Sequence, residues 1–169
     1  NFFIKTKIIK LKNKEIIKIS NSIGSDTILG FYSKNLILTS DNFIKTFPNK
    51  KKFYTLIVKP DFGCSTKEIY SMVRKFSKQR FKSPSKHVFN TNFLKKLNND
   101  LEIIALNKYP RLKTLKIFLE KLSNYEFVRM TGSGSAIIAY FNTRKKSKEA
   151  EKKVKKQFRN YWCKISKTI

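Results

Sequence analysis

The stretch RMTGSGSAIIAYF, residues 129–141, contains a group of side chains that could do chemistry. Its centre is a glycine loop, Thr131, Gly132, Ser133, Gly134 and Ser135, between two apolar runs whose β-branched and aromatic residues predict strands. Alternating glycines let successive backbone N–H groups turn toward one point, and the serines add hydroxyl donors. The loop could therefore hold phosphate. An ordinary glycine hairpin with solvated serines would explain the same residues.

Two common phosphate-binding motifs do not describe the glycine loop. No Gly-Lys-Ser/Thr follows it, which excludes a Walker loop. Ile137 stands where the dinucleotide fingerprint needs a third glycine. A phosphate-binding role must therefore be supported by other residues of the chain.

Asp26 is the second candidate for chemistry. It precedes an apolar run, so its carboxylate could simply cap a helix or turn. An aspartate could also orient an attacking hydroxyl and accept its proton. His87 stands alone among lysines and is expected at the surface, and Cys64 and Cys163 have no metal-type spacing. We therefore assign no metal ligands.

The composition limits the class of protein. The 169 residues carry 38 Lys and Arg against 11 Asp and Glu, a net charge of +27. Only six of the basic residues are Arg, the preferred residue for bidentate phosphate contacts, and the lysines are spread along the chain. A genome-wide bias toward A/T-rich codons, which encode Lys, Asn, Ile and Phe, explains this charge more simply than specific nucleic-acid binding. No apolar run is long enough to span a membrane, and a reduced, cytoplasmic setting fits the two cysteines.

Sequence periodicity predicts the elements that position these residues. In the first part of the chain we expect a helix over residues 13–22 and two strands joined by a turn at Asp41-Asn42, then a boundary near Pro48 and the lysines after it. The chain begins with Asn rather than Met, and we expect its start to be a cut within a longer chain.

A second part is expected to begin at Phe53. It should contain a strand over residues 53–59, and a helix capped by a reciprocal Ser65/Glu68 box, with Ile69, Met72, Val73 and Phe76 on its apolar side. Further predicted elements are helices over 89–106 and 110–122, the two strands around the glycine loop, a helix over 146–158 and a last strand over 161–169. This order is typical of a ferredoxin-like split β-α-β sandwich with helices on one face of an antiparallel sheet.

Three stretches together resemble one family: IGSD at 23–26, VKPDFGCSTKEIY at 58–70, and residues 99–141, which run from NDLE to MTGSGSAIIAYF. They are similar to the C-terminal two-thirds of the 4-diphosphocytidyl-2-C-methyl-D-erythritol kinases of the GHMP kinase superfamily. The resemblance implies an α+β, GHMP kinase-like fold. Residues 1–50 would be the end of an incomplete N-terminal α/β, ATP-binding domain, and residues 51–169 the ferredoxin-like C-terminal domain.

The resemblance also implies an activity. Such a kinase phosphorylates a hydroxyl of 4-diphosphocytidyl-2-C-methyl-D-erythritol, with ATP and Mg²⁺, in the methylerythritol phosphate pathway of isoprenoid biosynthesis. Asp26 would be the catalytic aspartate, Thr66 and Tyr70 would line the cytidine-diphosphate pocket, and Gly132, Ser133, Gly134 and Ser135 would form the third GHMP motif. The expected partners are these two small molecules, with no membrane and no specific nucleic acid.

The chain departs from the family pattern in two ways. Thr27 and Ile28 replace the usual Val-Pro after the aspartate, which puts the geometry around Asp26 in doubt. The first motif with its lysine, and the second motif that cradles the triphosphate, are not found in the 169 residues. Phosphoryl transfer depends on positioning and charge neutralisation, so we expect the chain alone to be inactive.

An alternative stays open: a basic ferredoxin-like module that binds RNA or another polyanion. That interpretation requires exposed aromatic side chains beside clustered basic ones on the sheet. The kinase interpretation requires the sheet's aromatic side chains to be buried and Asp26 to face the glycine loop across a cleft.

Overall fold

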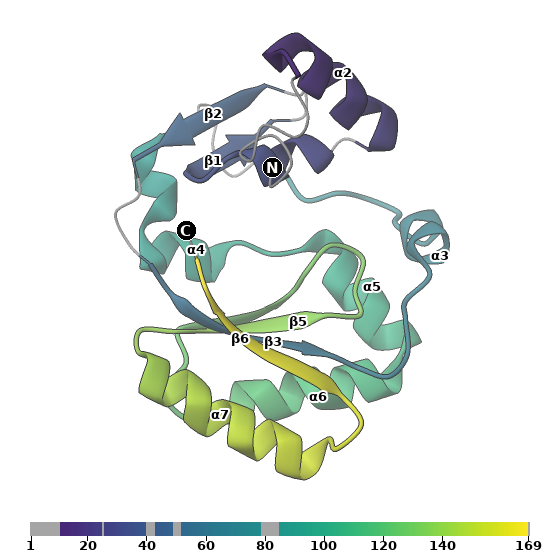
Figure 1. The fold of residues 1–169 in the computed structure, drawn as a ribbon. Coiled ribbons are helices and arrows are strands. Elements are labelled where there is room, and N and C mark those ends of the chain that lie inside the picture. The colour runs from purple at the N-terminus through teal and green to yellow at the C-terminus, as the bar shows by residue number, and fades with distance from the viewer. Residues whose placement is uncertain (1–10, 25, 40–42, 49–51, 79–84, 169) are drawn as a thin grey trace. The chain divides into compact units, whose positions relative to one another are not determined.

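A computed structural model gives the fold, and it describes residues 11–24, 26–39, 43–48, 52–78 and 85–168 (Figure 1). The chain divides into two compact units between residues 50 and 51, here called the first and the second unit. The predicted turn at Asp41-Asn42 lies outside the described residues.

The first unit contains a helix, a 3-10 turn and a two-stranded antiparallel ribbon. Its elements are α2 (Asn13–Ile23), η1 (Thr27–Phe31), β1 (Asn35–Leu38) and β2 (Ile44–Phe47). The Glu15 carboxylate accepts a hydrogen bond of 2.6 Å from the N–H of Lys12, which satisfies a backbone donor at the start of α2. The predicted helix and both predicted strands are confirmed.

The second unit is built on one antiparallel sheet whose strands lie in the order β4-β5-β3-β6. The strands are β3 (Tyr54–Lys59), β4 (Phe127–Met130), β5 (Ile137–Phe141) and β6 (Trp162–Lys167). The helices are α3 (Thr66–Ser71), η2 (Lys86–Phe89), α4 (Thr91–Lys96), α5 (Asp100–Lys108), α6 (Pro110–Lys121) and α7 (Arg144–Gln157). Strand β3, the first of this unit in the chain, lies between β5 and β6, as the first strand of a ferredoxin-like sandwich does. The predicted fold class is therefore confirmed.

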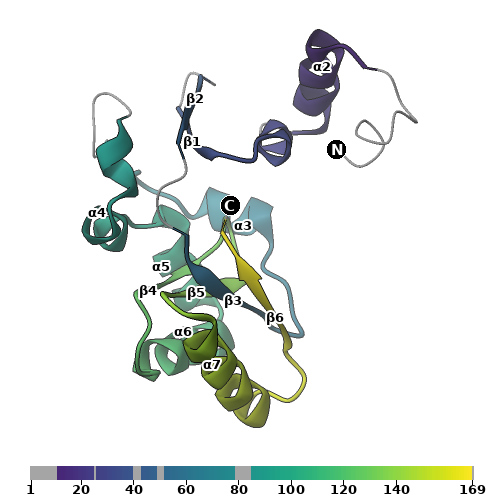
Figure 2. The same ribbon diagram turned by 60° about the vertical axis from the view of Figure 1, so that its left-hand side comes forward.

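Helices α6 and α7 lie side by side beneath the sheet in both ribbon views (Figures 1 and 2). Helix α7 contacts β3, β5 and β6, while α6 contacts β4 and α5. Between these helices and the sheet lies a core of fully buried side chains: Leu56, Val58, Ile69, Leu112, Leu115, Leu119, Met130, Ile137, Phe141 and Val154. On β5 buried and half-buried residues alternate, because successive side chains point to opposite faces of a sheet.

The predicted helix over 89–106 is wrong, because the structure divides it into α4 and α5. Leu97 has an extended backbone between them, and the guanidinium of Arg129 donates to the carbonyls of both Leu94 and Leu97, at 2.6 Å each. The next helix, α5, is capped by Asn99, whose side-chain oxygen accepts from the N–H of Leu101 at 3.0 Å. Asparagine favours such a cap over a helix interior.

The helix that starts after Ser65 is shorter than its apolar spacing predicts. Ser65 does cap it, accepting from the N–H of Glu68 at 3.3 Å, but the reciprocal half of the box is not made. The Ser65 N–H donates instead to the Tyr109 hydroxyl at 3.2 Å, and the Glu68 carboxylate pairs with Lys108 at 2.8 Å. The helix ends at Ser71, and Met72 and Phe76, expected on its buried side, are 47% and 60% exposed.

Candidate functional site

The glycine loop closes the hairpin between β4 and β5. Met130 lies opposite Ile137, and the N–H of Thr131 donates to the carbonyl of Ala136 at 3.0 Å. Inside the loop the N–H of Gly134 donates to the carbonyl of Thr131, also at 3.0 Å. The N–H groups of Gly132 and Ser133, and that of Ser135, make no hydrogen bond to any described residue. The loop therefore has backbone donors for a ligand.

Both glycines of the loop have a backbone conformation that favours glycine. The φ angles are +52° at Gly132 and +92° at Gly134. A Cβ atom at Gly134 would lie 3.0 Å from the Cys64 sulfur and 3.0 Å from the Met130 sulfur. Cys64 thus packs against the loop, and its burial raises the pKa of its thiol.

The two serines of the loop have different roles. Ser135 is 4% exposed, and its hydroxyl donates to the carbonyl of Phe62 at 2.7 Å, so this side chain anchors the loop. Ser133 is half-buried, and its hydroxyl lies 2.8 Å from the hydroxyl of Thr66. The hydroxyl of Ser133 is the one that lies at the surface of the loop.

The Thr66–Ser133 contact brings together two residues that were predicted for different roles. Thr66 is the first residue of α3, and Tyr70 lies one turn later on the same side of that helix. The Tyr70 ring is 53% exposed. Helix α3 therefore presents an exposed hydroxyl beside the loop and an exposed aromatic ring four residues further on.

Asp26 belongs to the first unit. It precedes η1 in a helical backbone conformation, and its carboxylate makes no capping hydrogen bond to that 3-10 turn. The predicted convergence of Asp26 on the glycine loop joins two units that are described separately, so it stays a prediction.

Asn99 and Glu102 were quoted as part of the family pattern, but sequence reasoning gave them no structural role. The Asn99 amide donates to the carbonyls of Met130 and Gly132, at 3.1 and 2.7 Å. The Glu102 carboxylate accepts from the N–H of Met130 at 2.5 Å. An asparagine and a glutamate three residues apart at the start of a helix face one direction, and this spacing was the available signal.

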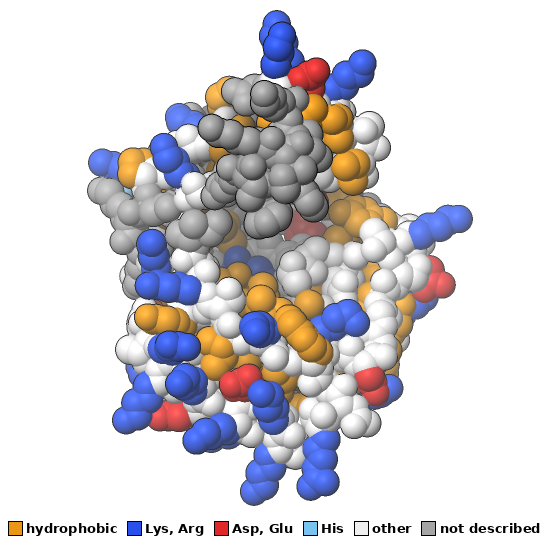
Figure 3. Space-filling model, in the orientation of Figure 1, with side chains coloured by type: hydrophobic (Ala, Val, Ile, Leu, Met, Phe, Trp, Pro, Cys, Tyr) orange, Lys and Arg blue, Asp and Glu red, His pale blue; other side chains and the backbone are white. Residues whose placement is uncertain are grey.

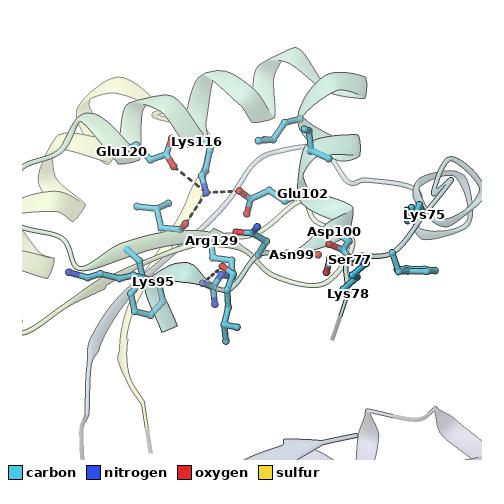
Figure 4. A pocket seen from close by; sticks show the side chains of 17 residues that line it. Lys75, Ser77, Lys78, Lys95, Asn99, Asp100, Glu102, Lys116, Glu120 and Arg129 are labelled. Carbon is cyan, nitrogen blue, oxygen red and sulfur yellow. Dashed lines mark hydrogen bonds and ion pairs between the residues drawn. The ribbon is translucent and has the colours of Figure 1, made fainter. Parts of the chain in front are cut away.

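A hollow of about 790 Å³ lies behind these two residues (Figure 4). Its wall includes Asn99 and Glu102, and Lys116 and Arg129 beside them, but it contains neither Thr66, Tyr70 nor any residue of the glycine loop. This hollow is thus separate from the predicted site residues. Asn99 is the residue that touches both.

The surface bears on the nucleic-acid alternative. On the face seen in Figure 3, Lys and Arg side chains are spread among acidic and apolar ones. On the sheet, Phe127 and Phe141 are buried and Tyr140 is half-buried, whereas Trp162 is 55% exposed. The kinase interpretation requires buried aromatic side chains on the sheet, and this pattern favours it. Trp162 is the exception.

Two absences concern the described part of the chain. None of its helices has the length and apolar character required to cross a membrane. It also contains no cluster of three or more His, Cys, Asp or Glu side chains that could hold a metal ion.

Comparison with known proteins identifies similar sequences. Residues 72–160 match the family model of the C-terminal region of GHMP kinases. A 4-diphosphocytidyl-2-C-methyl-D-erythritol kinase from Pelagibacter ubique is 54% identical over 169 residues, which is 100% of this chain and 60% of that protein. A kinase of the same name from Clostridium tetani is 33% identical over 94% of this chain and 58% of that protein. The chain therefore spans about 60% of the length of these relatives.

Solved structures show the same fold at low sequence identity. A 4-(cytidine 5'-diphospho)-2C-methyl-D-erythritol kinase aligns with a TM-score of 0.66 over 86% of this chain and 54% of that one, at 17% identity. Homoserine kinase from Cytophaga hutchinsonii aligns with a TM-score of 0.58 over 81% of this chain, at 13% identity.

Proposed function

Because the chain belongs to the GHMP kinase family, we propose that the whole protein transfers a phosphoryl group from ATP to a hydroxyl of 4-diphosphocytidyl-2-C-methyl-D-erythritol. This reaction would be a step in the synthesis of isoprenoid precursors. The observation that carries the proposal is the 2.8 Å contact between the hydroxyls of Thr66 and Ser133. It joins the helix predicted to bind the cytidine-diphosphate substrate to the loop predicted to lie beside the transferred phosphate.

The glycine loop would contribute by positioning phosphate. Phosphoryl transfer depends on fixed donors around the transferring group, and backbone N–H groups cost no reorganisation during the reaction. The N–H groups of Gly132, Ser133 and Ser135 have no partner in the described residues and are suited to this role. The buried anchor at Ser135 keeps these donors in place.

Helix α3 would bind the other substrate. The exposed Tyr70 ring offers an apolar, aromatic surface of the kind on which a pyrimidine base stacks. The Thr66 hydroxyl, on the same side of the helix, could bond to a polar group of the ligand and to Ser133 together. Substrate and loop would then meet at the start of α3.

Asp26 would orient the attacking hydroxyl and take its proton late in the reaction. Mg²⁺ would be bound mainly by the phosphates of ATP, as is usual for this ion in kinases. The donor set fits such a shared ion: single carboxylates such as Asp26 are present, whereas the described residues contain no cage of three acidic or metal-ligating side chains. When bound, Mg²⁺ would neutralise charge on the transferring phosphoryl group.

A chimera tests the proposal. This chain would replace the matching region of the Pelagibacter ubique relative, and ³¹P NMR would follow phosphorylation of the cytidyl substrate by ATP. We expect turnover by the chimera. The 169-residue chain, assayed beside it, tests the expectation that the chain alone is inactive. A folded chimera that binds both substrates and forms no phosphorylated product would contradict the proposed function.

Asp26→Asn in the chimera tests the catalytic assignment. The substitution keeps the size of the side chain and removes the proton acceptor, so we expect kcat to fall about 100- to 10,000-fold with little change in substrate affinity. Asp61→Asn is the matched control, because Asp61 pairs with Arg111 in the second unit and has no predicted catalytic role. Equal rates for the two variants would remove Asp26 from the mechanism.

A further inference from the structure

Strand β4 lies at an edge of the sheet, so one side of its backbone has no strand partner. Backbone N–H and C=O groups on such an edge need other partners when they are buried. Three side chains supply them. Lys116 donates to the carbonyl of Val128 at 2.8 Å, and Glu102 and Asn99 bond to the N–H and the carbonyl of Met130. The last of these groups belongs to the residue immediately before the glycine loop.

Asn99 extends this pairing into the loop itself. One amide nitrogen donates to the carbonyls of Met130 and Gly132, at 3.1 and 2.7 Å, while the amide oxygen caps α5. The capping oxygen could be supplied by aspartate or serine as well. Aspartate could not replace the two hydrogen bonds that the amide donates, because a carboxylate has no hydrogen to donate to a carbonyl. The choice of asparagine is therefore explained by the loop rather than by the helix.

Glu102 is held in turn by a buried cation (Figure 4). Lys116 is 7% exposed, and its ammonium group lies 2.6 Å from one Glu102 oxygen and 3.3 Å from the Glu120 carboxylate. The other Glu102 oxygen receives the Met130 N–H at 2.5 Å. The ammonium group donates hydrogen bonds to the Val128 carbonyl and to Glu102, and it forms an ion pair with Glu120. This network fixes the end of β4 and the carboxylate that bonds to it.

We propose that Asn99 and the Glu102–Lys116 pair are positioning residues for the glycine loop. They hold the carbonyl of Gly132 on the α5 side. The Ser133 N–H belongs to the same planar peptide and is therefore directed away from α5, where phosphate would bind. The inference rests on the proposed function, because it assigns these residues to the loop's phosphate role. It extends that function to residues that touch neither substrate.

Asn99→Asp in the active chimera is the first test, with Asn90→Asp as its matched control. Asn90 also caps a helix, accepting from the N–H of Asn92 at 2.9 Å, so both substitutions keep a capping oxygen. Only Asn99→Asp removes donors to the loop. We expect kcat/KM for ATP to fall about 100-fold for Asn99→Asp, the loss typical of a small misplacement of catalytic groups, and to stay near the parent value for Asn90→Asp.

Hydrogen exchange in the 169-residue chain provides a measurement that does not depend on activity. We expect the amides of Met130 and Gly134 to exchange about tenfold faster in Asn99→Asp than in Asn90→Asp, the ratio expected for the loss of about one hydrogen bond. Unchanged exchange at both amides would overturn the positioning role. This outcome can be read even if the chimera has no kinase activity, so failure of the inference is distinguishable from failure of the proposed function.

The charged pair is tested by combining two substitutions. Lys116→Met leaves the Glu102 carboxylate buried beside one cation fewer, and we expect faster loop exchange and a lower kcat/KM for ATP. Adding Glu102→Gln removes that carboxylate charge while keeping an oxygen to accept from Met130. We expect the double variant to recover at least half of the lost kcat/KM on a logarithmic scale. No recovery in a folded double variant, or no loss in Lys116→Met, would contradict the role of the pair.

Discussion

The two units differ in how they bury apolar side chains. In the second unit, Leu56, Ile69 and Phe141 are fully buried in one continuous core. In the described part of the first unit only Ser20 and Phe47 are buried, and Ile19 and Ile23 on α2 are 46% and 70% exposed. A continuous core holds its side chains to within small displacements, whereas exposed apolar groups add little rigidity. The glycine loop has such a core beneath it, and Asp26 does not among the described residues.

This difference separates two kinds of variant. Substitutions around the glycine loop should alter both stability and activity, because the loop is joined to the core through Ser135, Asn99 and Glu102. Substitutions at Asp26 should alter activity alone. Three predictions test the comparison between the units, and a fourth examines the second unit alone, each in the 169-residue chain.

The largest effect is expected at Lys116. Lys116→Met would remove one partner of a buried ion pair and lower the free energy of unfolding by about 3–5 kcal/mol. Lys18→Met, on the exposed side of α2 in the first unit, should change it by no more than about 0.5 kcal/mol. Urea unfolding followed by circular dichroism measures both. Similar losses for the two variants would show that the units are equally supported.

Isoleucine truncation compares a buried helical position of the second unit with an exposed one of the first. Ile69→Ala in α3 would leave a cavity in the core and cost about 2–5 kcal/mol. Ile23→Ala in α2 should stay within about 0.5 kcal/mol, since that side chain is 70% exposed. Urea midpoints for the pair give the difference directly. A costly Ile23→Ala would mean that α2 packs far more tightly than its exposure indicates.

Glycine substitution compares the units at the backbone. Gly134→Ala would force a Cβ atom into a left-handed position against the sulfurs of Cys64 and Met130, at a cost of about 1–3 kcal/mol. Gly24→Ala in the first unit should be nearly neutral, because its φ of 161° is extended and its Cβ would meet only the Thr27 hydroxyl at 3.8 Å. Thermal unfolding measures both, and equal melting temperatures would contradict the assigned loop geometry.

The smallest effect is a pH dependence at Tyr140. Burial raises the pKa of this phenol in the folded state, with Arg129 nearby acting in the opposite direction. The folded protein then keeps a proton that the unfolded chain releases, so stability should fall as pH rises above about 10, the ordinary tyrosine pKa. Tyr140→Phe should flatten that fall relative to the parent, as measured by urea unfolding between neutral and alkaline pH. A steeper fall in the variant would reverse the assignment.

Local signals predicted much of the fold. The β-branched and aromatic runs on each side of Gly132 and Gly134 are sufficient to define β4, β5 and their turn. Ser65 was identified as a helix cap because capping depends on neighbours three residues away. The prediction of a single helix over 89–106 failed because distant residues determine where it is divided. Arg129 bonds to Leu94 and Leu97 at the division between α4 and α5.

The candidate site shows the same limit. The loop and Thr66 could each be chosen from sequence, but their contact joins residues that are 67 positions apart. Asn99 and Glu102 could be quoted as a pattern, yet their role depends on the edge of a strand about 30 residues later. Sequence periodicity describes neighbours within a few residues and carries no information on such pairs.

The bond from the Ser135 hydroxyl to the Phe62 carbonyl has a consequence for folding. It closes a segment of 73 residues, and the Thr66–Ser133 bridge closes one of 67. Contacts of such long range require most of the intervening chain to be ordered beforehand. During synthesis, β3 and α3 therefore cannot form these contacts until β4 and β5 have emerged. We expect the glycine loop and the start of α3 to reach their final arrangement only after the sheet has assembled.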